Sequence, residues 1–203
     1  MNKFPRSAYV HIPFCHRRCF YCDFAVIPLG NKVETLQGYG SKTVKEYLHF
    51  LYKEILSIKH KSSLSTIYVG GGTPSILDPQ QIKQLIDLFK ENYGVDYGAE
   101  ITMEVDPASF NLDDLHGFIN AGINRFSLGV QSFNNQILQK SGRRHLREDA
   151  EKSCSWLKKV YSAGLIKSWS LDLIQNLPLS GLREWKEDLK KAITFSPPHI
   201  SIY

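Results

Sequence analysis

The stretch Thr66-Ile-Tyr-Val-Gly-Gly-Gly-Thr-Pro-Ser-Ile-Leu-Asp-Pro79 contains a strand, a turn and the start of a helix. Its β-branched and aromatic beginning predicts a strand over residues 66–69, which stops at the glycines. Asp78 is suited to cap a helix, and Pro79 is suited to its first position. Apolar residues then recur at steps of three and four, at Ile82, Leu85, Ile86 and Phe89. The stretch therefore predicts a strand–helix unit.

The same alternation extends along the chain in both directions. Further strands are predicted at residues 8–12, 100–105, 125–130, 169–174 and 199–203, and further helices at 41–60, 112–121, 134–140, 148–163 and 182–195. This pattern predicts an α/β fold with a parallel sheet, either doubly wound or a barrel. No Pro- or Ser-rich linker interrupts it, so we predict one domain over residues 1–203. Because no helix follows the last strand, we expect a C-terminal portion to be missing.

The composition is that of an ordinary globular protein. The chain has 203 residues, of which 42% are hydrophobic and 22% charged, and a net charge of +5. No long apolar run predicts a transmembrane helix, and no secretory signal precedes the first strand. A cytoplasmic location follows as the expectation. The basic residues are scattered without interleaved aromatics, which argues against a nucleic-acid partner.

Three cysteines lie close together in the run His11-Ile-Pro-Phe-Cys-His-Arg-Arg-Cys-Phe-Tyr-Cys-Asp-Phe24. In a reducing compartment, such a cluster indicates metal ligands rather than disulfides. Cys15, Cys19 and Cys22 could hold an iron–sulfur cluster and leave one iron open. The alternative is a structural zinc ion, with His11 or His16 as fourth ligand. A fourth cysteine, Cys154, stands alone in a helical segment and is expected to be a packed core residue.

Polar residues follow the other predicted strands where each of them ends. They are the turn Gly70-Gly-Gly72-Thr73, Glu104, Asp106, Gln131, Ser132 and Asp172. Ligands bind at the carboxyl ends of parallel strands, so these groups are expected to share one rim with the cysteines. Each also has a plainer interpretation. The glycines would also fit a tight turn, and Asp106 before Pro107 would also fit a helix cap. Arg143 is equally consistent with a solvent-exposed surface residue, and His11 with a packed core residue.

Together, these motifs resemble those of the radical S-adenosylmethionine (SAM) enzymes, and more narrowly the oxygen-independent coproporphyrinogen III oxidase family. The resemblance covers residues 9–203. It is carried by Tyr9-Val-His-Ile-Pro-Phe-Cys15, Gly70-Gly-Gly-Thr-Pro-Ser75, Glu104-Val-Asp-Pro107, Asn124-Arg-Phe-Ser-Leu-Gly-Val-Gln-Ser-Phe133 and Asp172-Leu-Ile. It implies a partial, six-stranded parallel (β/α) barrel and a radical SAM core domain that lacks the C-terminal region covering the substrate.

The resemblance also implies the cofactors and their ligands. In the family, three cysteines hold a [4Fe–4S] cluster, here Cys15, Cys19 and Cys22. The open iron is chelated by SAM, which is cleaved to methionine and a 5′-deoxyadenosyl radical. By position, the SAM-contacting residues correspond to Tyr9, Tyr21, Gly71, Gly72, Thr73, Glu104, Gln131, Arg143 and Asp172. One departure lies after the fifth strand, where Gln175-Asn176 replaces the family's usual Tyr-Gly.

Two features distinguish the branches of this family. Coproporphyrinogen dehydrogenases carry another cysteine just after the triplet and an N-terminal extension before the first strand. This chain has Asp23-Phe24-Ala25 after the triplet and eight residues before Tyr9. Both features resemble the HemW-like branch of heme chaperones. The implied partners are a heme or porphyrin, an electron donor and a heme-recipient protein. The alternative is oxidative decarboxylation of coproporphyrinogen III to protoporphyrinogen IX.

Overall fold

The fold is built on one parallel sheet. The computed structural model describes residues 4–30, 42–58 and 62–203. Its six-stranded sheet has the order β1 (Ser7–Ile12), β4 (Leu64–Gly71), β5 (Val95–Val105), β6 (Arg125–Gln131), β7 (Ser168–Leu173) and β8 (His199–Ile202). Every neighbouring pair is parallel. The strands follow chain order and β1 does not pair with β8, so the sheet is an open, partial barrel, as predicted.

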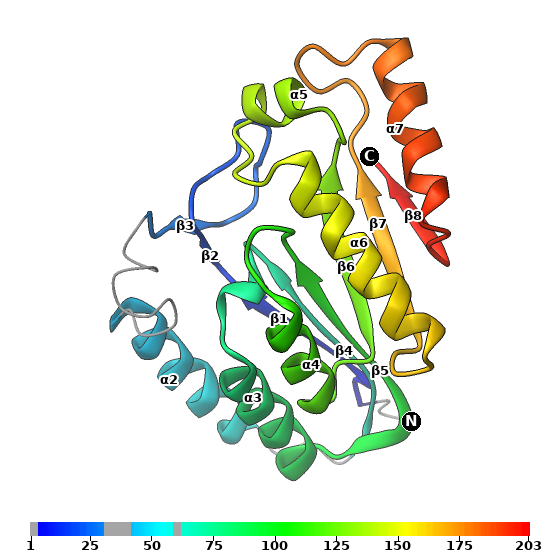
Figure 1. The fold of residues 1–203 in the computed structure, drawn as a ribbon. Coiled ribbons are helices and arrows are strands. Elements are labelled where there is room, and N and C mark those ends of the chain that lie inside the picture. Colours follow the sequence, from blue (N-terminus) through cyan, green and yellow to red (C-terminus); the bar gives the residue numbers. More distant parts are fainter. Residues whose placement is uncertain (1–3, 31–41, 59–61) are drawn as a thin grey trace.

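Helices connect the successive strands and pack beside the sheet (Figure 1). They are α2 (Lys42–Ser57), α3 (Pro79–Asn92), α4 (Leu112–Asn120), α5 (Asn135–Lys140), α6 (Arg147–Ser162) and α7 (Leu182–Thr194). A 3₁₀ turn, η1 (Pro74–Ile76), follows β4. The predicted start of α3 is confirmed: the Asp78 carboxylate accepts the Gln81 N–H at 2.8 Å, with Pro79 at the first helical position.

The strands have one apolar and one polar face. Along β5 and β6, for example, the paired Met103 and Phe126 are fully buried in the hydrophobic core. The alternate positions carry polar groups, such as Glu104 opposite Ser127. Side chains alternate with a period of two, so all six strands present the same division. The helices cover the apolar face, and the polar face lines the inside of the half-barrel.

The structure departs from the sequence prediction mainly at element ends. β4 and β5 begin earlier than predicted, at Leu64 and Val95, because these two residues pair with each other before a register shift. Two short strands, β2 (Phe14–Cys15) and β3 (Ile27–Pro28), pair across the cysteine segment and were not predicted. The predicted ends of the first helix, Ser41 and His60, lie outside the described residues.

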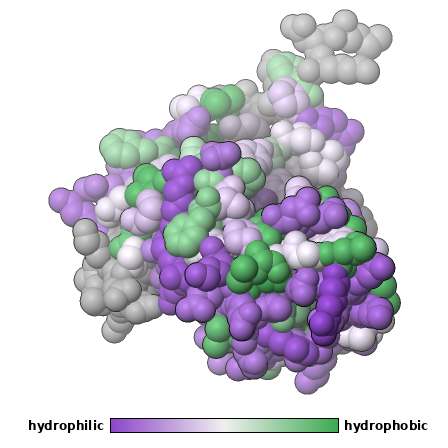
Figure 2. All heavy atoms as spheres, turned by 90° about the horizontal axis from the view of Figure 1, so that it is seen from above, coloured by the Kyte–Doolittle hydropathy of each residue, from purple (hydrophilic) through white to green (hydrophobic). Residues whose placement is uncertain are grey.

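Figure 2 shows the surface from above the view of Figure 1, with hydrophobic residues in small groups among hydrophilic ones. Scattered apolar groups of this kind are normal on a protein surface. Within the described ranges, no helix is long and apolar enough to cross a membrane.

Candidate cofactor site

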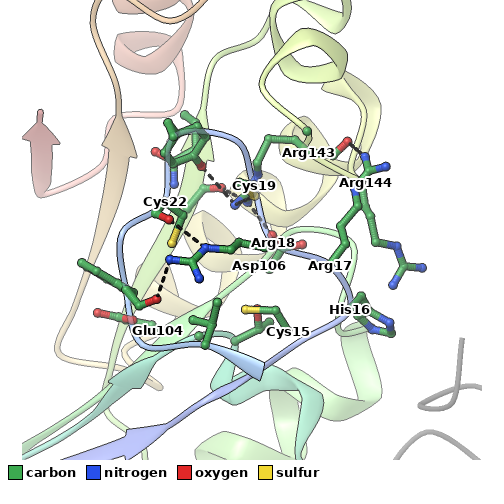
Figure 3. Close-up of a pocket in the computed structure, with 18 of the residues that line it drawn as sticks. Cys15, His16, Arg17, Arg18, Cys19, Cys22, Glu104, Asp106, Arg143 and Arg144 are labelled. Carbon is green, nitrogen blue, oxygen red and sulfur yellow. Dashed lines mark hydrogen bonds and ion pairs between the residues drawn. The ribbon is translucent and has the colours of Figure 1, made fainter. Parts of the chain in front are cut away.

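A cavity of about 420 Å³ opens at the carboxyl ends of the strands. All three clustered cysteines line it, as do residues from the ends of β4, β5, β6 and β7. Figure 3 shows Cys15, Cys19, Cys22 and Glu104 around this cavity, together with several arginines. Of the predicted site residues other than the cysteines, it is lined by Tyr21, Gly71, Gly72, Thr73, Glu104, Gln131, Arg143 and Asp172. The convergence predicted from the strand ends is therefore present.

The cysteine loop, residues 15–22, is attached to the turn after α5. The Phe20 N–H donates to the Ser141 carbonyl at 3.0 Å, and the Arg17 guanidinium donates to the Arg143 carbonyl. Between them lies Gly142, at a φ of +78°, where a Cβ would come within 3.2 Å of the Phe20 nitrogen. Glycine is favoured here for its left-handed backbone and for the close approach of the loop.

Cys15 lies against the glycine turn that follows β4. A Cβ on Gly72 would meet the Phe14 carbonyl oxygen at 2.6 Å and the Cys15 Sγ at 2.9 Å, so only glycine fits. The Thr73 hydroxyl approaches the same Sγ at 3.5 Å. Burial raises the pKa of the Cys15 thiol to about 11, although Thr73 lowers it. Without a bound cation, this thiol stays protonated near neutral pH, and a coordinated metal would ionise it.

Arg143 joins the cysteine loop to the sheet. Its guanidinium forms an ion pair with Asp106 and donates to the Gly129 carbonyl at 2.7 Å. Its other edge approaches the Tyr21 hydroxyl at 3.4 Å and the Cys19 Sγ at 3.8 Å. Burial alone would lower the pKa of Arg143, but the neighbouring carboxylate raises it above its ordinary value. The same pairing overcomes burial and holds the pKa of Asp106 below its ordinary value.

The pairing of Asp106 with Arg143 corrects one interpretation of the sequence. Asp106 was expected to cap the next helix, but Asn111 caps α4 by accepting the N–H groups of Asp113 and Asp114. Asp106 instead serves as the counter-ion of a cavity arginine and accepts the Ala108 N–H at 3.1 Å. Arg143 is likewise not a surface residue, since its side chain is only 11% exposed.

Glu104 faces the cavity from the end of β5. Its carboxylate accepts the Tyr68 hydroxyl at 2.8 Å and the Gly71 N–H at 3.0 Å. Burial raises the pKa of Glu104 above its ordinary value despite these two donors. Tyr68 also stacks on Tyr9, with ring centroids 6.0 Å apart. Tyr9 is 60% exposed and does not line the cavity, so it reaches the site indirectly, through Tyr68 and through a 3.0 Å hydrogen bond to the His11 ring.

The far wall of the cavity comes from β6 and β7. The Asp172 carboxylate accepts the Ser127 hydroxyl at 2.7 Å, which in turn accepts the Ser170 hydroxyl at 3.0 Å. Gln131 ends β6 at a φ of +67°, and its buried Oε1 has no hydrogen-bond partner among the described residues. A buried amide oxygen without a partner is costly, so a donor from a bound ligand would satisfy it.

Sequence reasoning missed several residues of this network. Tyr68, Ser127 and Ser170 lie on the polar strand face, where the period-two alternation before each strand end could have located them. Asp188, on α7, accepts the Ser132 hydroxyl and the Phe133 N–H, both at 2.7 Å. It thereby holds the turn that follows Gln131. No local signal marks Asp188, since its partners lie more than fifty residues away.

The donors present fit an iron–sulfur cluster with a polar ligand beside it. Three soft thiols from one loop face one cavity, Gly72 leaves room at Cys15, and Gln131 offers an unsatisfied oxygen. Among residues 4–30, 42–58 and 62–203, no three His, Cys, Asp or Glu side chains are arranged to hold a single metal ion. Cys154 is fully buried and does not line the cavity.

The half-barrel, its three clustered cysteines and the polar residues at its strand ends together indicate an α/β protein that depends on a cofactor. Residues 9–174 match the radical SAM superfamily, and this chain belongs to that superfamily. Membership implies a [4Fe–4S] cluster and SAM as cofactors.

Two curated relatives show which members of the superfamily the chain resembles in sequence. The chain is 40% identical over 200 residues to the heme chaperone HemW of Synechocystis, covering 98% of this chain and 47% of that protein. It is 34% identical over 205 residues to the oxygen-independent coproporphyrinogen III oxidase of Salmonella typhimurium, covering 98% of this chain and 41% of that protein. The chain thus spans about half the length, or less, of these two relatives.

A solved structure gives the same result for the fold. Coproporphyrinogen III oxidase (HemN) from Escherichia coli, described as a radical SAM enzyme, superposes with a TM-score of 0.82 at 32% identity. The match covers 98% of this chain and 44% of that one. The predicted resemblance to the oxygen-independent coproporphyrinogen III oxidase family is therefore confirmed.

Proposed function

We propose that this chain is the cofactor-binding core domain of a HemW-like protein, a radical SAM protein that binds heme for delivery. The observation that carries the proposal is the segment Asp23-Phe24-Ala25, directly after Cys22, which offers no further cysteine. Asp23 and Phe24 both line the cavity, so the departure from the dehydrogenase pattern lies at the site itself. The HemW relatives, 34–40% identical over 98% of the chain, support the same choice.

In this proposal, the thiolates of Cys15, Cys19 and Cys22 hold the cluster. The loop that carries them is pre-organised by its attachment to the Ser141 and Arg143 carbonyls. When bound together, the cluster and SAM supply one-electron reductive cleavage of the SAM sulfonium. The chain's own part is to hold and orient these ligands.

The polar rim is proposed to hold SAM. Backbone groups of Gly71, Gly72 and Thr73 suit the methionine amine, and the Arg143 guanidinium suits its carboxylate. Glu104, Gln131 and Asp172 suit the amine or the ribose hydroxyls. Tyr21 lines the cavity with its hydroxyl 3.4 Å from Arg143, where this hydroxyl can contact the ligand. Tyr9 is proposed to act by supporting Tyr68 and, through it, Glu104.

The cavity also offers groups suited to a heme or porphyrin. Phe24, which is 60% exposed, lines it together with Val26 and Ile174. Arg17 and Arg18 line the same cavity and carry guanidinium groups. An apolar wall with guanidinium groups suits a flat macrocycle that carries carboxylates.

A second candidate is the enzyme reaction, oxidative decarboxylation of coproporphyrinogen III propionates to vinyl groups. The similarity to HemN, at 32% identity with a TM-score of 0.82, favours it. The two candidates share the cluster and SAM site and differ in the fate of the porphyrin. Both need an electron donor, and the chaperone also needs a protein that receives the heme.

The test uses the 203-residue chain reconstituted anaerobically with iron and sulfide. We expect the wild-type protein to acquire the visible absorption of an iron–sulfur cluster and to bind SAM, and Cys19→Ala to do neither. Cys154→Ala is the matched control, because Cys154 is buried in the core and does not line the cavity. Equal iron loading in the two variants, or retention of zinc by the wild type, would contradict the cluster proposal.

The two functions are then separated with the reconstituted protein. Titration with heme should give a stable complex, visible as a shifted Soret band. Incubation with SAM, a reductant and coproporphyrinogen III, followed by porphyrin chromatography, should give no vinyl product. Protoporphyrinogen formation would instead establish the enzymatic function. Failure to bind heme in the presence of a fully loaded cluster would count against the chaperone.

A further inference from the structure

Arg143 has five N–H donors, and each of them has a partner. The NH2 group meets Asp106 and the Gly129 carbonyl, while the NH1 group faces the Cys19 Sγ and the Tyr21 hydroxyl. The remaining donor, Nε–H, points to the Nδ1 atom of His145 at 3.3 Å, and the NH2 nitrogen lies 3.2 Å from the same Nδ1 atom. A guanidinium is a rigid planar fork, so partners along one edge decide where the opposite edge points.

His145 is placed to be the acceptor on that edge. The residue is 1% exposed, and its Nε2 lies 3.0 Å from the Val130 carbonyl oxygen. A carbonyl only accepts, so Nε2 carries the proton and Nδ1 presents its lone pair to Arg143. Burial is the main cause that lowers the pKa of His145 to about 4, which keeps the ring neutral at physiological pH. A protonated ring would instead repel Arg143.

His145 does not itself line the cavity. It lies two residues beyond Arg143, and its ring is attached to the backbone of β6 at Val130. The two hydrogen bonds of His145 therefore connect Arg143 to β6, a strand of the core. Asp106 neutralises the charge of Arg143, while the neutral imidazole fixes the orientation of the guanidinium without adding charge.

We propose that His145 is a positioning residue: its neutral Nδ1 fixes the Arg143 guanidinium so that the NH1 edge points toward the cysteine loop and the cavity. The inference rests on the proposed function in one respect, namely that Arg143 binds the SAM carboxylate. The placement of Arg143 by His145 is independent of any cofactor. The two claims can therefore fail separately.

Three variants of His145 test the two hydrogen bonds of its ring separately. His145→Asn places a carbonyl oxygen near the position of Nδ1 and keeps the acceptor for Arg143. His145→Gln places an amide nitrogen near the position of Nε2 and keeps the bond to the Val130 carbonyl. His145→Leu removes both. Ser153→Ala is the matched control for the loss of a buried polar group, because Ser153 is fully buried and bonds only weakly, at 3.4 Å, to the Pro107 carbonyl.

The first measurement needs no cofactor. In the arginine Nε–H region of the NMR spectrum, the Arg143 signal, assigned through Arg143→Lys, should be shifted and protected from exchange. We expect this signal to persist in His145→Asn and Ser153→Ala and to be lost in His145→Gln and His145→Leu. An Arg143 signal unchanged in His145→Leu would overturn the proposal, even if that variant is less stable.

The second measurement is SAM affinity, normalised to iron content, in a double-mutant cycle with Arg143→Gln. His145→Leu should weaken binding about tenfold in the wild-type background, as expected for a lost bond to a charged group. It should have almost no effect in the Arg143→Gln background, because the two residues then act as one unit. Independent losses would refute a role through Arg143. If wild-type protein with a full cluster binds no SAM, the proposed function fails, while the NMR result still decides the placement.

Discussion

Acidification from pH 7 to pH 4 should destabilise the folded protein through one side chain, His145. The pKa of this ring falls from 6.5 in the unfolded chain to about 4 in the folded state, mainly because the ring is buried. Between these two values, the unfolded chain binds a proton that the folded chain does not. Stability due to His145 is therefore fully present above pH 6.5 and is lost as the pH falls toward 4.

The size of this effect follows from the difference between the two pKa values. At about 1.4 kcal/mol per pH unit, it amounts to roughly 3 kcal/mol over the whole interval. Burial raises the pKa values of Glu104 and Asp188, which makes these groups act in the opposite direction over part of the same interval. The measured quantity must therefore be a difference between two proteins that share those carboxylates.

The assay is urea unfolding of wild type and His145→Asn without cofactors, followed by circular dichroism at pH 7, 6, 5 and 4. The variant lacks the titrating ring, so the stability advantage of the wild type at pH 7 should shrink by about 2–3 kcal/mol on reaching pH 4. A difference that stays constant across this range would refute the buried, neutral histidine. A difference that grows toward low pH would refute the sign of the argument.

Three further predictions concern the cysteine loop and its surroundings. Gly142→Ala forces a left-handed backbone onto alanine and pushes its Cβ against Phe20; it should cost about 1–2 kcal/mol of unfolding free energy and lower iron loading, measured by urea unfolding and iron analysis. Asp188→Asn weakens the two hydrogen bonds that hold the turn after β6; it should cost about 1–3 kcal/mol and weaken SAM binding, measured by calorimetry, and unchanged stability would contradict it. Cys154→Ser buries a hydroxyl at a fully buried position; it should cost about 1–3 kcal/mol in thermal unfolding while leaving iron content unchanged.

The sequence predicted the elements well where the signals are local. The cap at Asp78 and the apolar spacing after it place α3 correctly, because both act within a few residues. Strand ends were less predictable. β5 extends back to Val95 because it pairs with Leu64, and residues 96–100 offer little β-propensity of their own.

The candidate site was predicted in part. Most of the residues placed at strand ends do line one cavity, since the carboxyl ends of parallel strands share one edge. The role of Asp106 was wrongly predicted, because a carboxylate before proline looks the same whether it caps a helix or pairs with a distant arginine. His145 directly follows Arg143 and Arg144 in the sequence, and only its burial in the folded chain indicates that its ring is neutral.

Sequence alone determined the α/β alternation, the cysteine spacing and the resemblance to radical SAM proteins. These depend on patterns within one strand, one helix or one loop, where neighbouring residues decide the local conformation. Tertiary structure alone decided that Arg143, more than a hundred residues from Cys19, lies beside it, and that Asp106 and His145 hold it there. Such contacts arise only when the parallel strands bring their ends together, because no local pattern encodes which distant groups will meet.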